Sequence, residues 1–335
     1  MEALFSPIQI KNLTLRNRFV MAPMTRCRAN NGVPTETMVE YYRKRAAGGL
    51  GMILTEGTLI DHPLANAYGD APYLREDTVA GWQAINQAIR EEGCFSFVQV
   101  WHCGPVARPG LAAVAVKDAG KEVVRAATEE DKHELLDIYK RSAHLAIESG
   151  FDGLELHAAH GYLLDSFLRS GQPEFVQEVV RATRSEVGSE FPIILRFSTW
   201  TVEDFEASYL KSPEELEALL LPLKEAGVDV FHPSVRRYWK PVFPDSSLSL
   251  AAWTKTISGL PTIAVGTIGL DPKDLGGDGE ASLATLDQKI KSGEFDMVAI
   301  GRALLTEPDW VNKVEAQHFD DIRPWYEQSA QDVYP

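Results

Sequence analysis

The chain has 335 residues, of which 44% are apolar and 24% charged, and its 33 basic and 48 acidic side chains leave a net charge of −15. This length and composition are those of an ordinary globular protein with a large core. A strongly acidic surface repels nucleic-acid phosphates and anionic lipid, so neither nucleic acid nor a membrane is an expected partner.

The cysteines and the N-terminus point to the cytoplasm. Cys27, Cys94 and Cys103 contain no Cys-x-x-Cys pair, and their odd number argues against a disulfide framework. The first residues lack the basic segment and apolar run of a secretory signal, and no apolar run approaches the roughly 20 residues that span a bilayer. We therefore expect a cytoplasmic protein that acts on a small molecule, as a monomer or a homodimer.

Short apolar runs alternate with longer amphipathic stretches along the chain. Most of the runs are continuously apolar, which is typical of parallel strands covered on both faces. The predicted strands are residues 18–25, 50–55, 95–101, 152–157, 192–198, 228–232, 261–266 and 295–301.

Helix signals lie between these runs. Ser212-Pro213-Glu214-Glu215 places a capping serine before a helix with proline in its first turn, and Thr128 precedes three acidic residues in the same manner. Further helices are predicted over residues 36–47, 77–92, 175–187, 281–291 and 310–317.

Eight predicted strands that alternate with predicted helices indicate an α/β protein with a (βα)8 TIM barrel, formed by one domain over residues 1–335. The competing interpretation is a doubly wound sheet in two domains. No Gly-x-Gly-x-x-Gly follows a strand, no Gly-x4-Gly-Lys-Ser/Thr occurs, and no linker-like segment divides the chain, so the barrel is favoured.

Barrels place their active sites at the C-terminal ends of the strands. In this chain those ends carry many hydrogen-bonding or titratable side chains that a packed core does not need. The residues at the ends are Pro23, Met24 and Thr25, Glu56 and Gly57, Gln99, Trp101 and His102, His157, His160 and Tyr162, Arg196, Gly266 and Thr267, and Gly301 and Arg302.

The ends of the last two strands indicate a phosphate site. Gly266-Thr267 and Gly301-Arg302 supply backbone N–H groups, a hydroxyl and a fixed cation where barrels frequently hold a phosphate. The alternative is that the glycines only end the strands and that Arg302 pairs with a surface acid.

His157 and His160 allow three interpretations. The first is a metal ion shared with His102 and Cys103, but no nearby carboxylate completes a common ligand set, and we predict no metal. The second is that both histidines are packing residues. The favoured interpretation is a pair of donors to one oxygen, with the Tyr162 phenol as an acid that protonates a basic carbon.

Several motifs, in order, resemble the old yellow enzyme family of flavin-dependent ene-reductases. They are RNRFVMAPMTR from Arg16, LTEGT from Leu54, QVWH from Gln99, GFDGLELHAAHGYLL from Gly150 and AIGRALL from Ala299. The resemblance extends over residues 5–314, and the HAAHGYLL stretch is the most specific part of it.

The resemblance implies FMN at the barrel mouth. Pro23, Met24, Thr25 and Gly57 would lie along the flavin ring, and Gln99 and Arg196 at its pyrimidine edge. His157 and His160 would bind the substrate carbonyl, with His157 also beside the flavin and Trp101 beside the substrate. Tyr162 would donate a proton. The flavin phosphate would be held by Gly266, Thr267, Gly301 and Arg302.

The implied reaction is a ping-pong reduction of the C=C bond of α,β-unsaturated carbonyl compounds by NAD(P)H. Two alternatives are a redox-neutral isomerase or cyclase on an unsaturated carbonyl, and a barrel with impaired flavin binding. Impaired flavin binding is considered because the segments after the third strand (residues 104–128) and the fourth strand (169–174) are shorter than in the family pattern. Arg236-Arg237 is either a contact for a nicotinamide phosphate or an ordinary exposed basic pair.

Overall fold

The computed structural model describes residues 1–276 and 279–330, so a few positions of the predicted domain, 277–278 and 331–335, lie outside it. Within this range, eight parallel strands pair in chain order, and β3 pairs with both β14 and β4, which closes the sheet. The prediction of a TIM barrel is therefore confirmed. The barrel strands are β3 (Phe19–Met21), β4 (Met52–Ile60), β6 (Phe95–Trp101), β10 (Gly153–His160), β11 (Ile193–Thr201), β12 (Val230–Ser234), β13 (Ile263–Val265) and β14 (Met297–Ile300).

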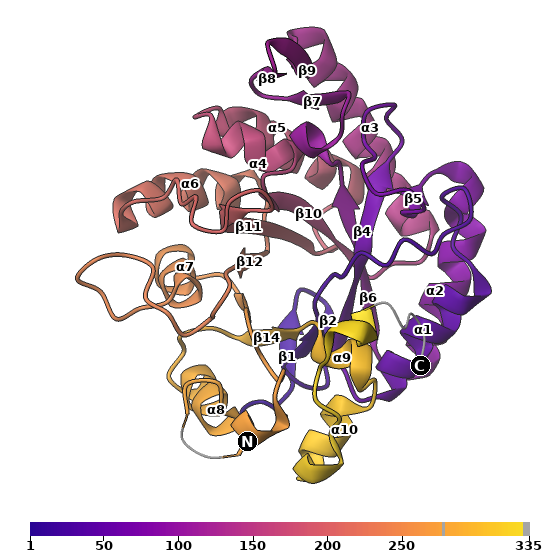
Figure 1. Cartoon of the computed structure of the whole chain (residues 1–335). Helices are drawn as coiled ribbons and strands as arrows, with labels where there is room; N and C mark the ends of the chain where they lie inside the picture. Colours follow the sequence, from indigo (N-terminus) through magenta and orange to yellow (C-terminus); the bar gives the residue numbers. More distant parts are fainter. Residues whose placement is uncertain (277–278, 331–335) are drawn as a thin grey trace.

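Helices surround the barrel on the outside (Figure 1). Ser212 and Thr128 cap their helices through the side-chain oxygen, as predicted. The structure also contains α4, α7 and α9, which the sequence pattern did not indicate. The helices are α1 (Glu36–Ala47), α2 (Val79–Glu91), α3 (Glu129–Glu148), α4 (Leu163–Arg169), α5 (Pro173–Val187), α6 (Pro213–Ala226), α7 (Leu250–Ser258), α8 (Leu283–Lys291), α9 (Ala303–Thr306) and α10 (Trp310–Glu315).

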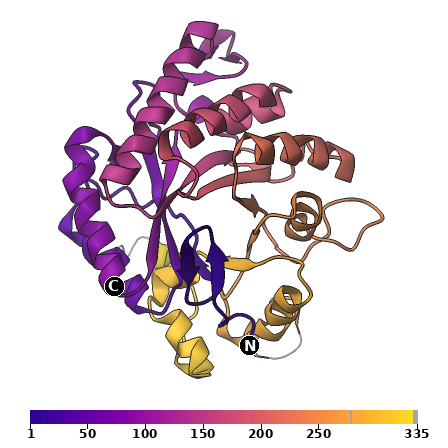
Figure 2. The same ribbon diagram turned by 180° about the vertical axis from the view of Figure 1, so that it is seen from behind.

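An N-terminal hairpin of β1 (Ile8–Ile10) and β2 (Leu13–Leu15) covers the end of the barrel where the strands begin. Figure 2 shows this hairpin across the barrel centre when the molecule is seen from behind. Ile10 and Leu15 belong to one buried cluster with Val20, Met52 and Phe97 of the barrel interior. Because this end is filled by apolar side chains, a ligand site is restricted to the opposite end.

The segment after β6 forms a small sheet of β7 (Gly110–Ala112), β8 (Val116–Asp118) and β9 (Lys121–Ala126). A short strand, β5 (Tyr73–Leu74), extends the barrel sheet beside β4. None of the helices within the described ranges is long and apolar enough to cross a membrane.

Candidate active site at the barrel mouth

Four aromatic rings meet at the C-terminal ends of β6 and β10. The Tyr162 ring lies edge-on to His157 at 4.9 Å and to Trp101 at 5.0 Å between ring centroids. The hydroxyl of Tyr68, from the loop after β4, lies 2.9 Å from the hydroxyl of Tyr162. Burial, reinforced by this hydrogen bond, raises the pKa of Tyr162. The phenol therefore keeps its proton at neutral pH.

His157 is neutral and its tautomer is defined by the backbone. Burial, followed by the charge of Arg196, holds the pKa of His157 well below its usual value. The Nδ1 atom accepts a hydrogen bond of 3.3 Å from the backbone N–H of Ala159. A neutral imidazole that accepts through Nδ1 carries its proton on Nε2, so His157 offers one N–H donor.

His160 lies at a tight turn with a positive φ of 66°, followed by Gly161 at 86°. Its ring meets His157 edge-on at 5.1 Å, and Trp200 stacks on it at 4.1 Å. Its Nε2 atom is 2.9 Å from the hydroxyl of Ser234. The structure thus brings both predicted histidines together, with one of them already engaged by a hydroxyl.

A partly buried ion pair between Asp165 and Arg169 holds this turn in place. Asp165 accepts hydrogen bonds of 2.6 Å from the backbone N–H of Gly161 and from Nε of Arg169. Arg169 also donates to the carbonyl of Trp200 at 3.1 Å. One side chain of α4 therefore connects the turn after β10 to the end of β11. Burial raises the pKa of Asp165 to about 6.

His102 contacts His62 and the loop that follows β6. Its Nε2 atom lies 3.0 Å from Nδ1 of His62, and its Nδ1 atom accepts from the backbone N–H of Gly104. Among the residues that the structure describes, no three His, Cys, Asp or Glu side chains are grouped to hold a metal ion.

A pocket of about 310 Å³ lies at the ends of β3 and β11 to β14. Seven predicted flavin residues line it: Pro23, Met24, Arg196, Gly266, Thr267, Gly301 and Arg302. The four other predicted flavin residues, Thr25, Gly57, Gln99 and His157, are outside its lining.

This lining fits a flavin nucleotide. Arg196 is only 6% exposed, and its Nε atom has no hydrogen-bond partner among the residues that the structure describes. A buried, unsatisfied guanidinium N–H is costly unless an anion or carbonyl binds it. Arg302 and the hydroxyl of Thr267 lie at the same pocket, which suits a phosphate.

Gln99 is oriented by a buried network that the sequence did not reveal. Its amide nitrogen donates to Glu155 at 2.7 Å, and the other Glu155 oxygen lies 2.6 Å from Nδ1 of His232. Glu155 and His232 are both fully buried. Because the amide N–H is used by Glu155, the Gln99 carbonyl oxygen is left for a donor such as a flavin N–H.

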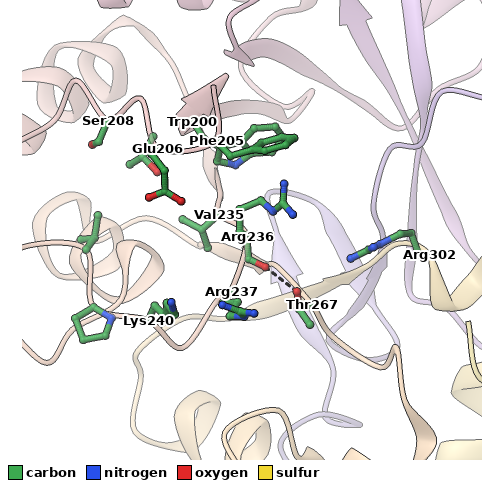
Figure 3. A pocket seen from close by; sticks show the side chains of 13 residues that line it. Trp200, Phe205, Glu206, Ser208, Val235, Arg236, Arg237, Lys240, Thr267 and Arg302 are labelled. Atoms are coloured by element: carbon green, nitrogen blue, oxygen red, sulfur yellow. Dashed lines mark hydrogen bonds between the residues drawn. The ribbon is translucent and has the colours of Figure 1, made fainter. Parts of the chain in front are cut away.

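Gly266 allows the loops after β12 and β13 to approach each other. It has a φ of 141°, and a Cβ atom there would lie 2.5 Å from the carbonyl oxygen of Val235. The neighbouring Thr267 hydroxyl donates to the carbonyl of Arg236 at 2.7 Å (Figure 3). Glycine at this position therefore brings Arg236 to the same rim as Arg302.

Glu56 holds the loop after β3. It is 1% exposed and accepts hydrogen bonds from the backbone N–H groups of Arg26 (2.8 Å) and Cys27 (3.1 Å). Burial, only partly offset by these bonds, raises the pKa of Glu56 to about 7. Glu56 thus fixes the segment that begins with the predicted flavin residues Pro23 and Met24.

Sequence reasoning gave no role to Tyr68, Trp200, Ser234, Glu155 or His232. Glu155 and His232 are titratable residues inside predicted apolar strands, which is a detectable signal of a buried polar site. Tyr68 and Trp200 lie among ordinary loop residues or beyond the predicted strand end, and Ser234 follows an apolar run. For these three the sequence offers no comparable signal.

Residues 3–321 match the model of the NADH:flavin oxidoreductase / NADH oxidase family. The chain is 30% identical to NADH oxidase of Thermoanaerobacter brockii, an alignment that covers 96% of this chain and 52% of the relative. It is also 30% identical to chanoclavine-I aldehyde reductase fgaOx3 of Penicillium roqueforti, over 94% of this chain and 89% of the relative. The chain therefore spans about half the length of the first relative and most of the second.

Solved structures share the fold. Morphinone reductase in complex with tetrahydroNAD superposes with a TM-score of 0.82 at 23% identity, covering 99% of this chain and 96% of that one. The old yellow enzyme homologue from Zymomonas mobilis gives a TM-score of 0.78 at 24% identity and covers 99% of both chains. With the family match over almost its whole length, the chain belongs to the NADH:flavin oxidoreductase / NADH oxidase family, that of the old yellow enzymes.

Proposed function

We propose that the protein is an NAD(P)H-dependent ene-reductase that holds FMN at the mouth of a single barrel domain. Its substrates are alkenes conjugated to a carbonyl group. The observation that carries the proposal is the contact between a neutral imidazole N–H donor and a protonated phenol, His157 and Tyr162, whose ring centroids are 4.9 Å apart. Bound FMN would supply the redox chemistry, accepting a hydride from the nicotinamide and delivering it to the alkene β-carbon.

The histidines polarise the substrate. The Nε2–H of His157 donates to the carbonyl oxygen, and this bond strengthens as the oxygen gains enolate charge. His160 supports the same oxygen when its Nε2–H turns from Ser234, 2.9 Å away, to the substrate. Trp101, with its ring 6.2 Å from that of His157 and stacked on it, forms a wall of the substrate site.

Tyr162 completes the reduction by protonating the α-carbon. Hydride addition leaves an enolate, and the phenol transfers its proton to that carbon. The hydrogen bond to the half-buried Tyr68 lets a second phenol return a proton to Tyr162. One hydride and one proton then account for the saturated product.

The remaining predicted residues hold the flavin. We propose that Pro23, Met24, Thr25 and Gly57 lie along the ring. Gln99 and Arg196 contact the pyrimidine edge, where the Arg196 charge stabilises reduced flavin. The phosphate is held by Gly266, Thr267, Gly301 and Arg302.

The test is the visible spectrum of purified protein reconstituted with FMN, recorded without oxygen before and after NADPH. Bleaching of the flavin bands, and their recovery when cyclohexenone is added, is the expected result. Cyclohexanone should accumulate in proportion to the NADPH consumed. If NADPH bleaches the flavin bands but no activated alkene restores them, the ene-reductase proposal is refuted. The protein would then be an NADPH-dependent flavin reductase only.

A further inference from the structure

A second pocket, of about 460 Å³, adjoins the 310 Å³ pocket in which we place the flavin, here called the flavin pocket. The second pocket is rich in positive charge (Figure 3). Of the described residues that line it, four are cationic, namely Arg236, Arg237, Lys240 and Arg302, and one is acidic, Glu206. We call it the cationic pocket. The chain as a whole has 48 acidic and 33 basic residues, so this concentration of cations runs against its overall charge.

The four cations have no acidic partner within the described part of the chain. Arg236 lies 4.1 Å over the ring of Phe205, and Arg302 lies 4.7 Å over the ring of Trp325. Burial, followed by the charge of Arg236, lowers the pKa of Arg302. Like charges that repel one another across a hollow are the arrangement expected at a site for an anion.

The loop that carries three of these cations is held firmly. Between Arg237 and Lys240, Tyr238 is 1% exposed, and its backbone N–H donates to the carbonyl of Gly266 at 3.3 Å. The Arg236 carbonyl accepts from Thr267. The cations are therefore presented from a fixed backbone, which reduces the entropy that binding must overcome.

An aromatic wall connects the cationic pocket to the candidate active site. Phe205, which is 52% exposed, packs against Trp200 at 5.6 Å between ring centroids, and Trp200 stacks on His160. Trp200, Arg236 and Thr267 line both this pocket and the flavin pocket. A ligand that combines a flat ring with phosphates matches an exposed aromatic side chain beside cations.

Arg237 and Lys240 line the cationic pocket but not the flavin pocket. A single flavin phosphate bound at Thr267 and Arg302 leaves the charges of Arg237 and Lys240 without an anionic ligand. We propose that the cationic pocket binds the phosphate groups of the nicotinamide adenine dinucleotide, with the adenosine portion against Phe205. This inference rests on the proposed function, because it places the donor's ring beside His160.

The test compares wild-type protein with the double variant Arg237→Gln/Lys240→Gln, both loaded with FMN. The first readout is the KM of flavin reduction for NADPH and for NADH. The second is direct calorimetric binding of adenosine 2′,5′-bisphosphate and of AMP, which needs no turnover. We expect the KM for NADPH and the Kd for the bisphosphate to rise about tenfold, because two charge-assisted contacts are lost.

A selective loss of NADPH and bisphosphate affinity would assign the pocket to the 2′-phosphate. An equal loss for NADH would assign it to the pyrophosphate that both donors share. Both results support a donor-phosphate site. Unchanged values for both donors and for the bisphosphate would overturn the proposal, and so would release of FMN from the double variant, since the cations would then serve the flavin.

Two further variants test whether the effect depends on charge inside the cationic pocket. Lys117→Gln/Arg141→Gln removes the same charge from exposed positions outside the pocket lining and should leave all four values within about twofold of wild type. Glu206→Gln removes the acidic lining residue and should lower the KM for NADPH. If these donor effects appear but no alkene is reduced, the proposed function fails while the phosphate site stands.

Discussion

The hydroxyl oxygens of Tyr68 and Tyr162 lie 2.9 Å apart although the two residues are 94 positions apart in the chain. Tyr162 ends the turn after β10, whereas Tyr68 comes from the loop between β4 and β5. The Tyr162 ring is also edge-on to His157. The proton donor that we propose and its proposed source of replacement protons thus come from two different strand–helix connections.

We expect Tyr162→Phe to slow alkene reduction by about 10²- to 10⁴-fold, because the variant loses the general acid. Flavin reduction by NADPH should change by less than about threefold. Stopped-flow measurement of the two half-reactions separates these effects. Tyr68→Phe is the matched comparison and should slow only the alkene step, by a smaller factor. Equal slowing of both half-reactions in Tyr162→Phe would exclude it as the acid.

Substrate binding should be independent of pH near neutrality. Burial and the charge of Arg196 keep the pKa of His157 well below its usual value of 6.5, so the imidazole stays neutral from about pH 6.5 to 8. We therefore expect the KM for cyclohexenone, measured in the alkene half-reaction, to stay constant over this range. A several-fold change centred near the ordinary histidine pKa would mean that His157 titrates in solution.

Glu56 should make the protein less stable as the pH rises. Its pKa is raised from 4.5 to about 7, so the folded state binds a proton that the unfolded state has released. This contribution to the free energy of unfolding is largest below pH 4.5 and is lost as the pH rises through 7, by up to about 3 kcal/mol.

Glu56→Gln cannot ionise and should abolish that part of the pH dependence. Urea unfolding at pH 5 and pH 8 is the measurement, and the variant should gain stability relative to wild type at the higher pH. Glu122→Gln, at an exposed position of β9, is the control. Parallel pH profiles for wild type and Glu56→Gln would contradict the assignment.

Gly57→Ala should disturb the aromatic cluster. A Cβ atom at this position would lie 2.5 Å from Cε3 of Trp101, which is only 1% exposed and cannot move freely. We expect a loss of about 1–3 kcal/mol in the free energy of unfolding and slower alkene reduction. Chemical denaturation measures the first and stopped-flow kinetics the second. Gly276→Ala, where the described residues leave open space, should be nearly neutral.

Much of the site could be predicted from the sequence because the barrel fold brings its residues together. In a closed parallel sheet the C-terminal end of every strand reaches the same rim, so residues as distant as Pro23 and Arg302 converge once the strand pattern is known. The stretch from His157 to Tyr162 is local in sequence, so its grouping needed no tertiary information. The apolar runs and the capping residues Ser212 and Thr128 likewise determined the fold class and two helix starts.

Only the tertiary structure decided which side chains complete the site. Glu155 and His232 are on strands separated by β11, and their hydrogen bond depends on the stagger of the barrel strands. Tyr68, Phe205 and Lys240 are carried by connecting loops, whose course follows from packing rather than from any period in the sequence. The sequence by itself determined the barrel and the histidine–tyrosine motif, because both arise from local patterns. The partner of Tyr162 and the cationic pocket depend on how loops distant in the chain pack on that barrel.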